Sequence, residues 1–428
     1  MDRRRFLGLA TATGMAGALG ATATGCGTDS GSAATLKLVA ADYGDPGGDN
    51  SSRVYWNDLV HRFHRKHPDI GVDVSVYSWN DVDKKVADLV KSGHAPDMAQ
   101  IGTYAGYAAA NKLYSASDLL SIPVQADFVQ SLAEAGEVQH IQYGMPFVSS
   151  TRLLFYNKKL FSKAGLDPDK PPESWDQLEH AASRLKDADV RIPYGLPLGP
   201  EEAQAEAMIW MLSGGGSYTD KVGSYTINAT ENIETFEWLR DHLVAKKLTN
   251  DNPGGTDRQD LFDAFSRGEV GMLNGHPTLM RQAERGHVKY GTSVVPGKHG
   301  PSPNTLGVAD WMMAFKNGGK RRQIGLFLDF VYGERNHYAL ADRYDILPVT
   351  ISASSRMRHS SEHKKLWRFL DELSSADFYP VGKVSWADVS ATIKKRIGTA
   401  VEKDGDPTAV LGDLQRKGDA KETSEGGT

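Results

Sequence analysis

Polar and aromatic side chains stand directly behind three stretches whose patterns predict buried strands. These stretches are residues 36–40, 70–76 and 98–101, and the side chains behind them are Asp42, Tyr43, Trp79, Thr103 and Tyr104. Because ligand clefts of open α/β sheets lie at the carboxyl ends of the strands, we expect these side chains to border one cleft. A carboxylate accepts hydrogen bonds from ligand hydroxyl groups, and aromatic rings cover apolar C–H surfaces.

Two of these residues have an ordinary structural alternative. Asp42 could instead lie at the N-terminus of the next helix, where the helix dipole favours a negative charge. Trp79 could be a half-buried packing residue rather than a platform on which a ligand stacks. The sequence leaves both alternatives open.

The chain contains one cysteine, Cys26, and its position predicts a lipid modification. Three arginines at residues 3–5 precede Phe6-Leu7, and residues 8–25 carry no charge, which is the pattern of an export signal. The arginines resemble the signal of the twin-arginine export route, with the general secretory route as the alternative. Residues 23–26, Ala-Thr-Gly-Cys, resemble a bacterial lipobox.

Residues 1–25 are therefore expected to be an export signal peptide, and residues 26–34 a lipidated tether. Two acyl chains on Cys26 would anchor the protein stably, because each buried CH₂ contributes about 0.8 kcal/mol. The alternative is a free cysteine in a flexible leader. Cleavage after residue 25 removes three arginines and one aspartate, so the net charge changes from −5 to −7.

The composition is that of an ordinary globular protein. With 428 residues, 40% hydrophobic and 24% charged, the chain is long enough for two or more domains. This composition excludes disordered, collagen-like and coiled-coil chains. The net charge of −5 provides no positive electrostatic potential that would attract a phosphate backbone, so no nucleic-acid partner is expected. We also expect no cofactor and no metal.

The hydrophobic period switches between two and about 3.6 residues from Leu36 onward, which predicts alternating strands and helices. Helices at 56–63 and 82–90 separate the three strands named above, so a sheet with parallel strands is expected. A second α/β series follows residue 156. Its predicted helices are 175–186, 204–212, 233–244, 261–265 and 324–332, and its predicted strands are 270–273, 290–295 and 312–315.

Motifs of nucleotide-binding proteins, zinc proteases and serine hydrolases are absent from the sequence. It has no Walker-type glycine loop, no G-x-G-x-x-G behind a strand, no H-E-x-x-H and no G-x-S-x-G. His61, His64 and His67 share one helical face, but the arginines and the lysine beside them oppose a bound cation. This face is therefore interpreted as solvated, and no enzymatic activity is expected.

Residues 143–158 resemble the extracellular solute-binding proteins of sugar-type, maltose-binding-like ABC importers. Tyr143-Gly-Met-Pro146 is similar to the segment that leads into the second lobe of that family, and Phe155-Tyr-Asn-Lys158 is similar to the end of the next strand. Weaker similarities follow in the family's order at 95–97, 174–178, 214–216, 265–272, 306–307 and 346–348. The resemblance covers nearly all of residues 35–415 and is specific through order and spacing.

The resemblance implies an α/β fold of the two-lobed, type II periplasmic-binding-protein class, with a ligand cleft between the lobes. Three interlobe crossings would fall near Pro146–Ser150, Leu306–Asp310 and Ile346–Pro348. Lobe 1 would comprise residues 35–146 and 308–347, lobe 2 residues 147–307 and 348–415, and residues 416–428 a disordered tail. Hinge motion at the crossings would close the lobes on the ligand.

The resemblance also adds eight residues to the candidate site. They are Ser150 and Arg152 at the first crossing, Asp310 and Trp311 at the second, Tyr344 before the third, Asn274 and His276 in the second lobe, and Trp386 near the C-terminus. The family commonly has Asn-Gly-Pro-Trp where this chain has Asn-Gly-His-Pro, so the site departs from a maltose-like one. The adjacent pair Asp310 and Trp311 is expected to bind most strongly.

These added residues also have structural alternatives. Arg152 could form an ion pair between the lobes. Trp311 could be a core residue with Asp310 as a hinge cap, and Trp386 could pack a helix.

The sequence thus predicts a lipid-anchored, monomeric receptor on the outer face of the cytoplasmic membrane. It would capture a sugar or oligosaccharide and deliver it to the membrane permease of an ABC importer. An exported carbohydrate-active enzyme is one alternative, and it would need two carboxyl groups about 5 to 10 Å apart. A receptor for a non-sugar solute, such as a peptide or a metal chelate, is the other.

Overall fold

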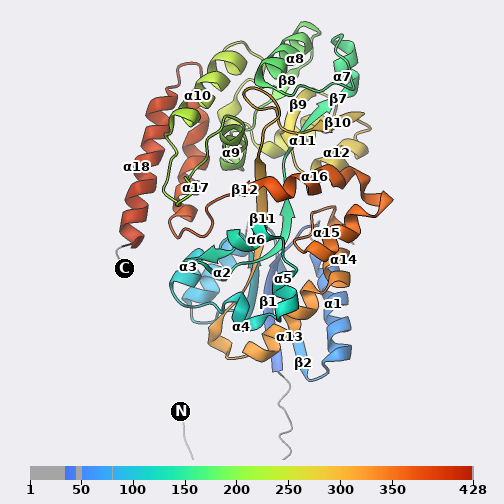
Figure 1. The fold of residues 1–428 in the computed structure, drawn as a ribbon, viewed down its shortest axis with the longest axis vertical. Helices are drawn as coiled ribbons and strands as arrows, with labels where there is room; N and C mark the ends of the chain where they lie inside the picture. The colour runs from blue at the N-terminus through green and yellow to red at the C-terminus, as the bar shows by residue number, and fades with distance from the viewer. Residues whose placement is uncertain (1–33, 45–50, 80, 427–428) are drawn as a thin grey trace, which may run out of the picture.

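The computed structural model describes residues 34–44, 51–79 and 81–426. Cys26, the signal peptide and the tether before residue 34 lie outside the described residues, so what the sequence predicts for them stays a prediction. Two β-sheets, each covered by helices, form the two ends of an elongated molecule (Figure 1). No described helix combines the length and the apolar character that a membrane crossing requires.

The first lobe is built on a sheet of strand order β12-β11-β3-β1-β2, in which β6 also pairs with β11. Strands β1 (Ala34–Ala41), β2 (Ile70–Tyr77) and β3 (Met98–Ile101) are parallel, as the alternating periodicity predicts. Helices α1 (Ser52–Lys66) and α2 (Val82–Lys91) connect them. Strands β6 (Met145–Ser150) and β11 (Thr305–Ala314) are antiparallel to each other, and β12 (Ala376–Phe378) pairs with the start of β11.

Helices on both faces of this sheet bury its side chains. Trp56 and Phe63 of α1 are buried, and they pack against Phe147 of β6 and against Phe327, respectively. The other elements of this lobe are α3 (Ala105–Ala109), α4 (Ala116–Leu119), α5 (Ile122–Ala126), α6 (Gln130–Ala135), β4 (Glu137–Val138), β5 (Ile141–Gln142), α13 (Arg321–Tyr332), α14 (Glu334–Tyr344) and α15 (Ile351–Arg358).

The second lobe is built on a sheet of order β10-β7-β9-β8. Its strands are β7 (Leu153–Asn157), β8 (Ile192–Gly195), β9 (Val270–Gly275) and β10 (Tyr290–Ser293). Helix α9 (Ala203–Ser213) is buried along nearly its whole length, which explains its apolar sequence. The other helices are α7 (Lys158–Lys163), α8 (Trp175–Asp187), α10 (Thr230–Trp238), α11 (Arg258–Ser266), α12 (Thr278–Arg285), α16 (Trp367–Glu372), α17 (Trp386–Arg396) and α18 (Pro407–Gly426).

Three segments that are distant in sequence lie side by side between the two sheets. Ser149 pairs with Ala309 of β11, and it also exchanges two backbone hydrogen bonds of 3.0 Å with Leu347. Strand β11 begins in the core of the second lobe at Leu306 and reaches the core of the first lobe at Met312. The segments expected to be crossings are therefore neighbours in the structure.

The structure differs from two predictions: one lobe boundary and the disorder of the C-terminal tail. Residues 349–358 pack on the first lobe, because Val349 accepts from Val129 N–H at 2.9 Å and α15 contacts α14, so the chain does not leave this lobe at residue 348. The described part of the predicted disordered tail, residues 416–426, is helical. Buried Leu411 and Leu414 anchor α18 in the second lobe, and Lys383 pairs with Glu422 at 2.6 Å, although the tail's composition is polar.

Candidate functional site

Asp42 follows β1 and organises the start of α1. Its carboxylate accepts hydrogen bonds from the backbone N–H of Ser52 at 2.7 Å, from that of Gly44 at 3.0 Å and from the hydroxyl of Ser51 at 2.8 Å. Burial alone would raise the pKa of Asp42, but these hydrogen bonds hold it below its ordinary value. The geometry thus matches the structural alternative, in which Asp42 is a carboxylate at a helix N-terminus.

Tyr43, Asp310 and Gln100 form a hydrogen-bonded group that joins β1, β11 and β3. The Tyr43 hydroxyl donates to Asp310 Oδ2 at 2.8 Å and accepts from Gln100 Nε2 at 2.7 Å. Gln100 in turn accepts from Ala41 N–H at 2.9 Å. We did not predict Gln100, although a glutamine inside the apolar strand 98–101 is a signal that sequence reasoning could have used.

Asp310 titrates far from the ordinary range of an aspartate. Burial raises its pKa to about 7, and the charges of Asp83 and Glu202 act in the same direction, against the lowering effect of the Tyr43 hydrogen bond. Asp310 therefore holds a proton through much of the acidic range. A carboxyl group in this state can donate a hydrogen bond as well as accept one.

Two aromatic rings surround Tyr43 beside this group. Trp79 lies edge-on to Tyr43 at 5.7 Å between ring centroids, and Tyr344 lies at 5.8 Å. Trp79 is 37% exposed, so its indole can cover an apolar surface of a ligand. Tyr344 is buried, whereas Thr103 is exposed behind β3.

Trp311 and Tyr104 are core residues. Trp311 is 1% exposed and packs against Tyr104 with ring centroids 5.2 Å apart, in a cluster that also holds Val82 and Met313. Tyr104 is also buried, and its hydroxyl donates to the carbonyl of Ala135 at 2.6 Å. The expected adjacent pair is therefore split, and only Asp310 stays in the site that we describe.

The second lobe presents a group of paired charges at the ends of its strands. Arg152 precedes β7, and its guanidinium donates to Ser150 Oγ at 3.0 Å and to Glu202 Oε1 at 3.1 Å. Arg258 lies against the other oxygen of Glu202 at 2.5 Å and also pairs with Glu201. Burial would raise the pKa of Glu202, but Arg152 and Arg258 hold it below its ordinary value. Arg152 thus pairs within the second lobe and not between the lobes.

His276 and Asn274 lie behind these charges, at the end of β9. Burial and the neighbouring Arg152 and Arg258 hold the pKa of His276 well below its ordinary value, so its imidazole is neutral. Asn274 donates to Glu206 Oε1 at 3.2 Å, and Trp210 donates to the same oxygen at 2.8 Å.

Glu206 is a buried carboxyl group without a cationic partner among the described residues. Burial raises its pKa to about 8, although the hydrogen bonds from Trp210 and Asn274 lower it. Glu206 is therefore protonated at neutral pH. It lines a small hollow together with Arg152, Glu202, Arg258 and His276.

The two groups approach each other where the crossings lie. Thr305 at the start of β11 donates to the carbonyl of Arg152 at 2.8 Å, and Val308 pairs with Ser150. Asp310 stands two residues farther along β11, close enough to feel the charge of Glu202. The structure therefore brings Tyr43, Trp79, Ser150, Arg152 and Asp310 to one region.

Trp386 packs among aromatic side chains at the start of α17. It is 5% exposed, stacks on Tyr379 at 5.5 Å and contacts Tyr218 at 5.2 Å. Its burial matches the alternative of a helix-packing tryptophan at the start of α17.

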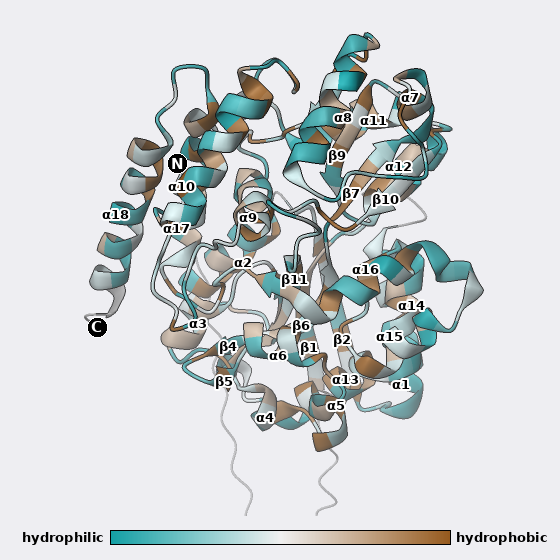
Figure 2. Cartoon of the chain, turned by 45° about the horizontal axis from the view of Figure 1, so that its top comes forward, coloured by the Kyte–Doolittle hydropathy of each residue, from teal (hydrophilic) through white to brown (hydrophobic). Residues whose placement is uncertain are grey.

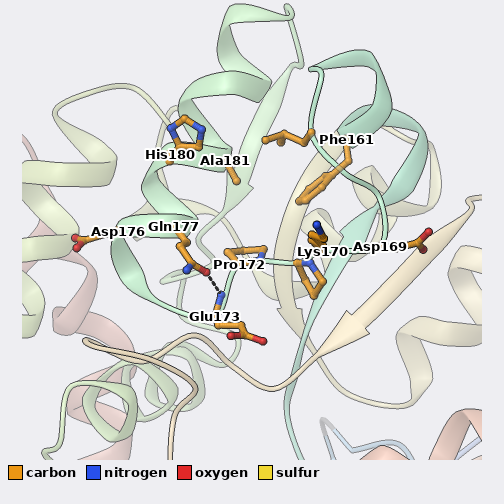
Figure 3. Close-up of a pocket in the computed structure, with 11 residues that line it drawn as sticks. Phe161, Asp169, Lys170, Pro172, Glu173, Asp176, Gln177, His180 and Ala181 are labelled. Carbon is orange, nitrogen blue, oxygen red and sulfur yellow. Dashed lines mark hydrogen bonds between the residues drawn. The ribbon is translucent and has the colours of Figure 1, made fainter.

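A larger hollow lies on the outer side of the second lobe, between α7 and α8 (Figure 3). It is lined by residues such as Pro172 and His180. In Figure 3 the one hydrogen bond among its labelled residues joins Glu173 N–H to Gln177 Oε1, at 2.8 Å. None of the predicted site residues lines it, so we do not assign the ligand site to this hollow.

Comparison with known proteins decides the family. The bacterial extracellular solute-binding proteins match residues 48–338 of this chain. The chain belongs to this family. As a solute-binding protein it is an exported binding protein, in line with the family expected from the sequence.

Individual relatives of this solute-binding protein are distant in sequence. A binding protein of Brucella abortus (strain 2308) is 24% identical over 397 residues, which cover 91% of this chain and 93% of the relative. The sn-glycerol-3-phosphate-binding periplasmic protein UgpB of Escherichia coli (strain K12) is 25% identical over 332 residues, which cover 72% and 74%.

The two-lobed α/β fold is confirmed by solved structures. The cyclic alpha-maltosyl-1,6-maltose binding protein from Arthrobacter globiformis superposes with a TM-score of 0.77 at 18% identity, over 91% of this chain and 99% of that protein.

Proposed function

We propose that this solute-binding protein captures a sugar or oligosaccharide between its lobes and delivers it to the permease of an ABC importer. The observation that carries the proposal is the group formed by Tyr43, Asp310 and Trp79. It combines a carboxyl group for ligand hydroxyls with an exposed indole for a ligand's C–H face. The name of the Arthrobacter protein, which binds a cyclic maltosyl-maltose, supports the same ligand class.

The direct test is a thermal-unfolding screen over mono- and oligosaccharides. A ligand at 100 times its dissociation constant should stabilise the protein by about 2.7 kcal/mol. The variant Asp310→Asn should lose this stabilisation, whereas Asp263→Asn, a change of the same chemistry on the exposed side of α11, should keep it. If no carbohydrate raises the unfolding temperature of the parent, the sugar proposal fails.

A second measurement tests whether the lobes close on a bound ligand. Ligand should close the lobes about the three crossings, and the radius of gyration in solution scattering should then decrease. An unchanged radius at saturating ligand would contradict closure.

One observation favours a phosphorylated polyol as a second ligand class. The UgpB relative binds sn-glycerol 3-phosphate, and Arg152 and Arg258 offer guanidinium groups of the kind that bind phosphate. Both guanidinium groups already face Glu202, which opposes an added anion. Including sn-glycerol 3-phosphate in the same screen distinguishes the two classes.

We further propose that Cys26 carries lipid and anchors the protein to the outer face of the membrane. The lipobox-like residues 23–26 support this assignment. The variant Cys26→Ala should release the protein from membranes on fractionation, and retention equal to that of the parent would contradict the anchor.

A further inference from the structure

The end of the first lobe that lies farthest from the second lobe carries a cationic surface. Two adjoining hollows open there, and both are lined by the last turn of α1 and by α13 or the turn that follows it. Their cationic residues are Arg62, Arg65, Lys66, Arg322 and Arg335, and their acidic residues are Asp69, Asp329 and Glu334. We call these eight residues the basic end; they carry a net charge of +2, in a chain whose net charge is −5.

Most of the cations of the basic end have no acidic partner among the described residues. Arg65, Lys66, Arg322 and Arg335 are exposed and form no ion pair there, whereas Arg62 pairs with Asp58 at 2.9 Å. Two of the acidic residues are engaged: Glu334 pairs with Arg356, and Asp329 accepts from Ser121 N–H at 3.0 Å. The surface therefore presents more unpaired positive than negative charge.

Helix stability does not explain all of these cations. Arg65 and Lys66 lie in the last turn of α1, where the helix dipole favours positive charge. Arg322 and Arg335, however, lie in the first turns of α13 and α14, where the dipole opposes it. Their position is thus unfavourable for the helices and calls for another partner.

An exposed apolar side chain adjoins the basic end. Ile122, in the first turn of α5, is 81% exposed, and the hydrogen bond from Ser121 to Asp329 places this turn against the end of α13. Helices α5 and α13 lie together at the lower end of the molecule in Figures 1 and 2. A cationic surface with a protruding apolar side chain suits the boundary between lipid headgroups and acyl chains.

The chain enters the first lobe at this same end. Ala34, where β1 begins, lines one of the two hollows beside Lys66 and Arg322. Only eight residue steps separate Ala34 from Cys26, so the chain between them spans no more than about 30 Å. A lipid on Cys26 would hold the basic end close to the bilayer.

We propose that the basic end docks on the anionic phospholipid headgroups of the membrane and so orients the tethered receptor. This proposal rests on the proposed lipid anchor for its orientation, but the affinity of the surface for lipid does not require the anchor. Cationic side chains near an anionic bilayer attract it individually, and salt screens the attraction over about 8 to 10 Å.

The test measures sedimentation of the mature chain, residues 26–428 with Cys26→Ser, with vesicles of phosphatidylglycerol and phosphatidylcholine or of phosphatidylcholine alone. We expect binding to the anionic vesicles only, decreasing with added salt. The variant Arg65→Glu/Lys66→Glu/Arg322→Glu should bind at least tenfold more weakly, and Ile122→Ser should weaken binding by a smaller factor.

The matched control reverses three exposed cations of the second lobe, Lys159→Glu/Arg285→Glu/Lys289→Glu, which changes the net charge equally. It should bind the anionic vesicles as the parent does. Equal loss in both triple variants, or no binding by the parent, would overturn the proposal. Because this chain carries no lipid, a failed Cys26 anchor would show only in the fractionation of Cys26→Ala and not here.

Discussion

The two faces of the proposed cleft differ in how they hold polar groups. The first lobe offers Tyr43, Asp310 and Trp79, joined by hydrogen bonds and ring contacts without an ion pair among them. The second lobe offers Arg152 and Glu202, which form an ion pair. The first face is therefore suited to hydroxyl groups and C–H surfaces, and the second face is already neutralised internally. This contrast suggests that the first lobe carries most of the recognition of an uncharged ligand.

The largest expected effect is on stability, and it distinguishes a core tryptophan of the first lobe from a tryptophan of the proposed cleft. Trp311→Ala should lower the free energy of unfolding by about 3 to 5 kcal/mol, because it empties a fully buried site. Denaturant unfolding measures this loss, and calorimetric titration should find near-parental affinity.

Trp79→Ala is the matched control, since Trp79 is partly exposed. It should cost little stability and weaken ligand binding. The reverse pattern, in which Trp311→Ala keeps its stability but loses affinity, would return Trp311 to the site.

The second effect tests the paired charges of the other face. Arg152→Met should destabilise the protein by about 3 kcal/mol. Arg152 is buried, and without its guanidinium group Glu202 would keep Arg258 as its one cationic partner among the described residues. The double variant Arg152→Met/Glu202→Gln should recover part of this loss, and a double-mutant cycle in urea measures the coupling. Additive effects would show that the pair is not coupled.

The third effect concerns pH. Glu206 has a pKa raised to about 8, so the folded state keeps a proton that the unfolded state loses near pH 4.5. The contribution of this group to stability should therefore be full below about pH 4.5 and should fall, by about 1.4 kcal/mol per pH unit, as the pH rises toward 8.

Glu206→Gln should remove this contribution, so the difference in unfolding temperature between variant and parent should change steadily from pH 5 to 8. Asp310→Asn should show a similar change that ends near pH 7, because the pKa of Asp310 is about 7. A difference that stays constant across this range would contradict the raised pKa of Glu206.

The smallest expected effect tests the hydrogen bonds of the Tyr43 hydroxyl on the first lobe's face of the cleft. Tyr43→Phe removes the hydroxyl that connects Gln100 to Asp310, at a cost of about 1 kcal/mol in ligand binding or in stability. Calorimetric titration and thermal unfolding of one preparation separate the two. Tyr107→Phe, which alters a partly buried tyrosine on α3 that packs on Phe315 and has no hydrogen bond to Asp310, should leave affinity unchanged.

Much of the fold could be predicted because its signals are local. Strict alternation at residues 70–76 predicts β2, which is observed at Ile70–Tyr77. The helical period at 56–63 predicts α1, which is longer at both ends and spans Ser52–Lys66. The helix at 416–426 could not be predicted, since it depends on contacts such as the hydrogen bond that the Ser385 hydroxyl donates to Glu422 Oε2 at 2.7 Å. Polar composition alone does not reveal such anchoring.

The sequence by itself determined the alternation of strands and helices at residues 36–101 and the presence of polar residues behind those strands, because both depend on local periodicity. Only the tertiary structure decided which of these residues lie together beside the crossings and which are buried in a core. Neighbours in sequence can have different surroundings, so Asp310 binds Tyr43 while Trp311 is buried against Tyr104. The tertiary structure also brings Glu202 and Arg152 together, which are 50 residues apart in sequence, because such a pair forms only when the chain has folded.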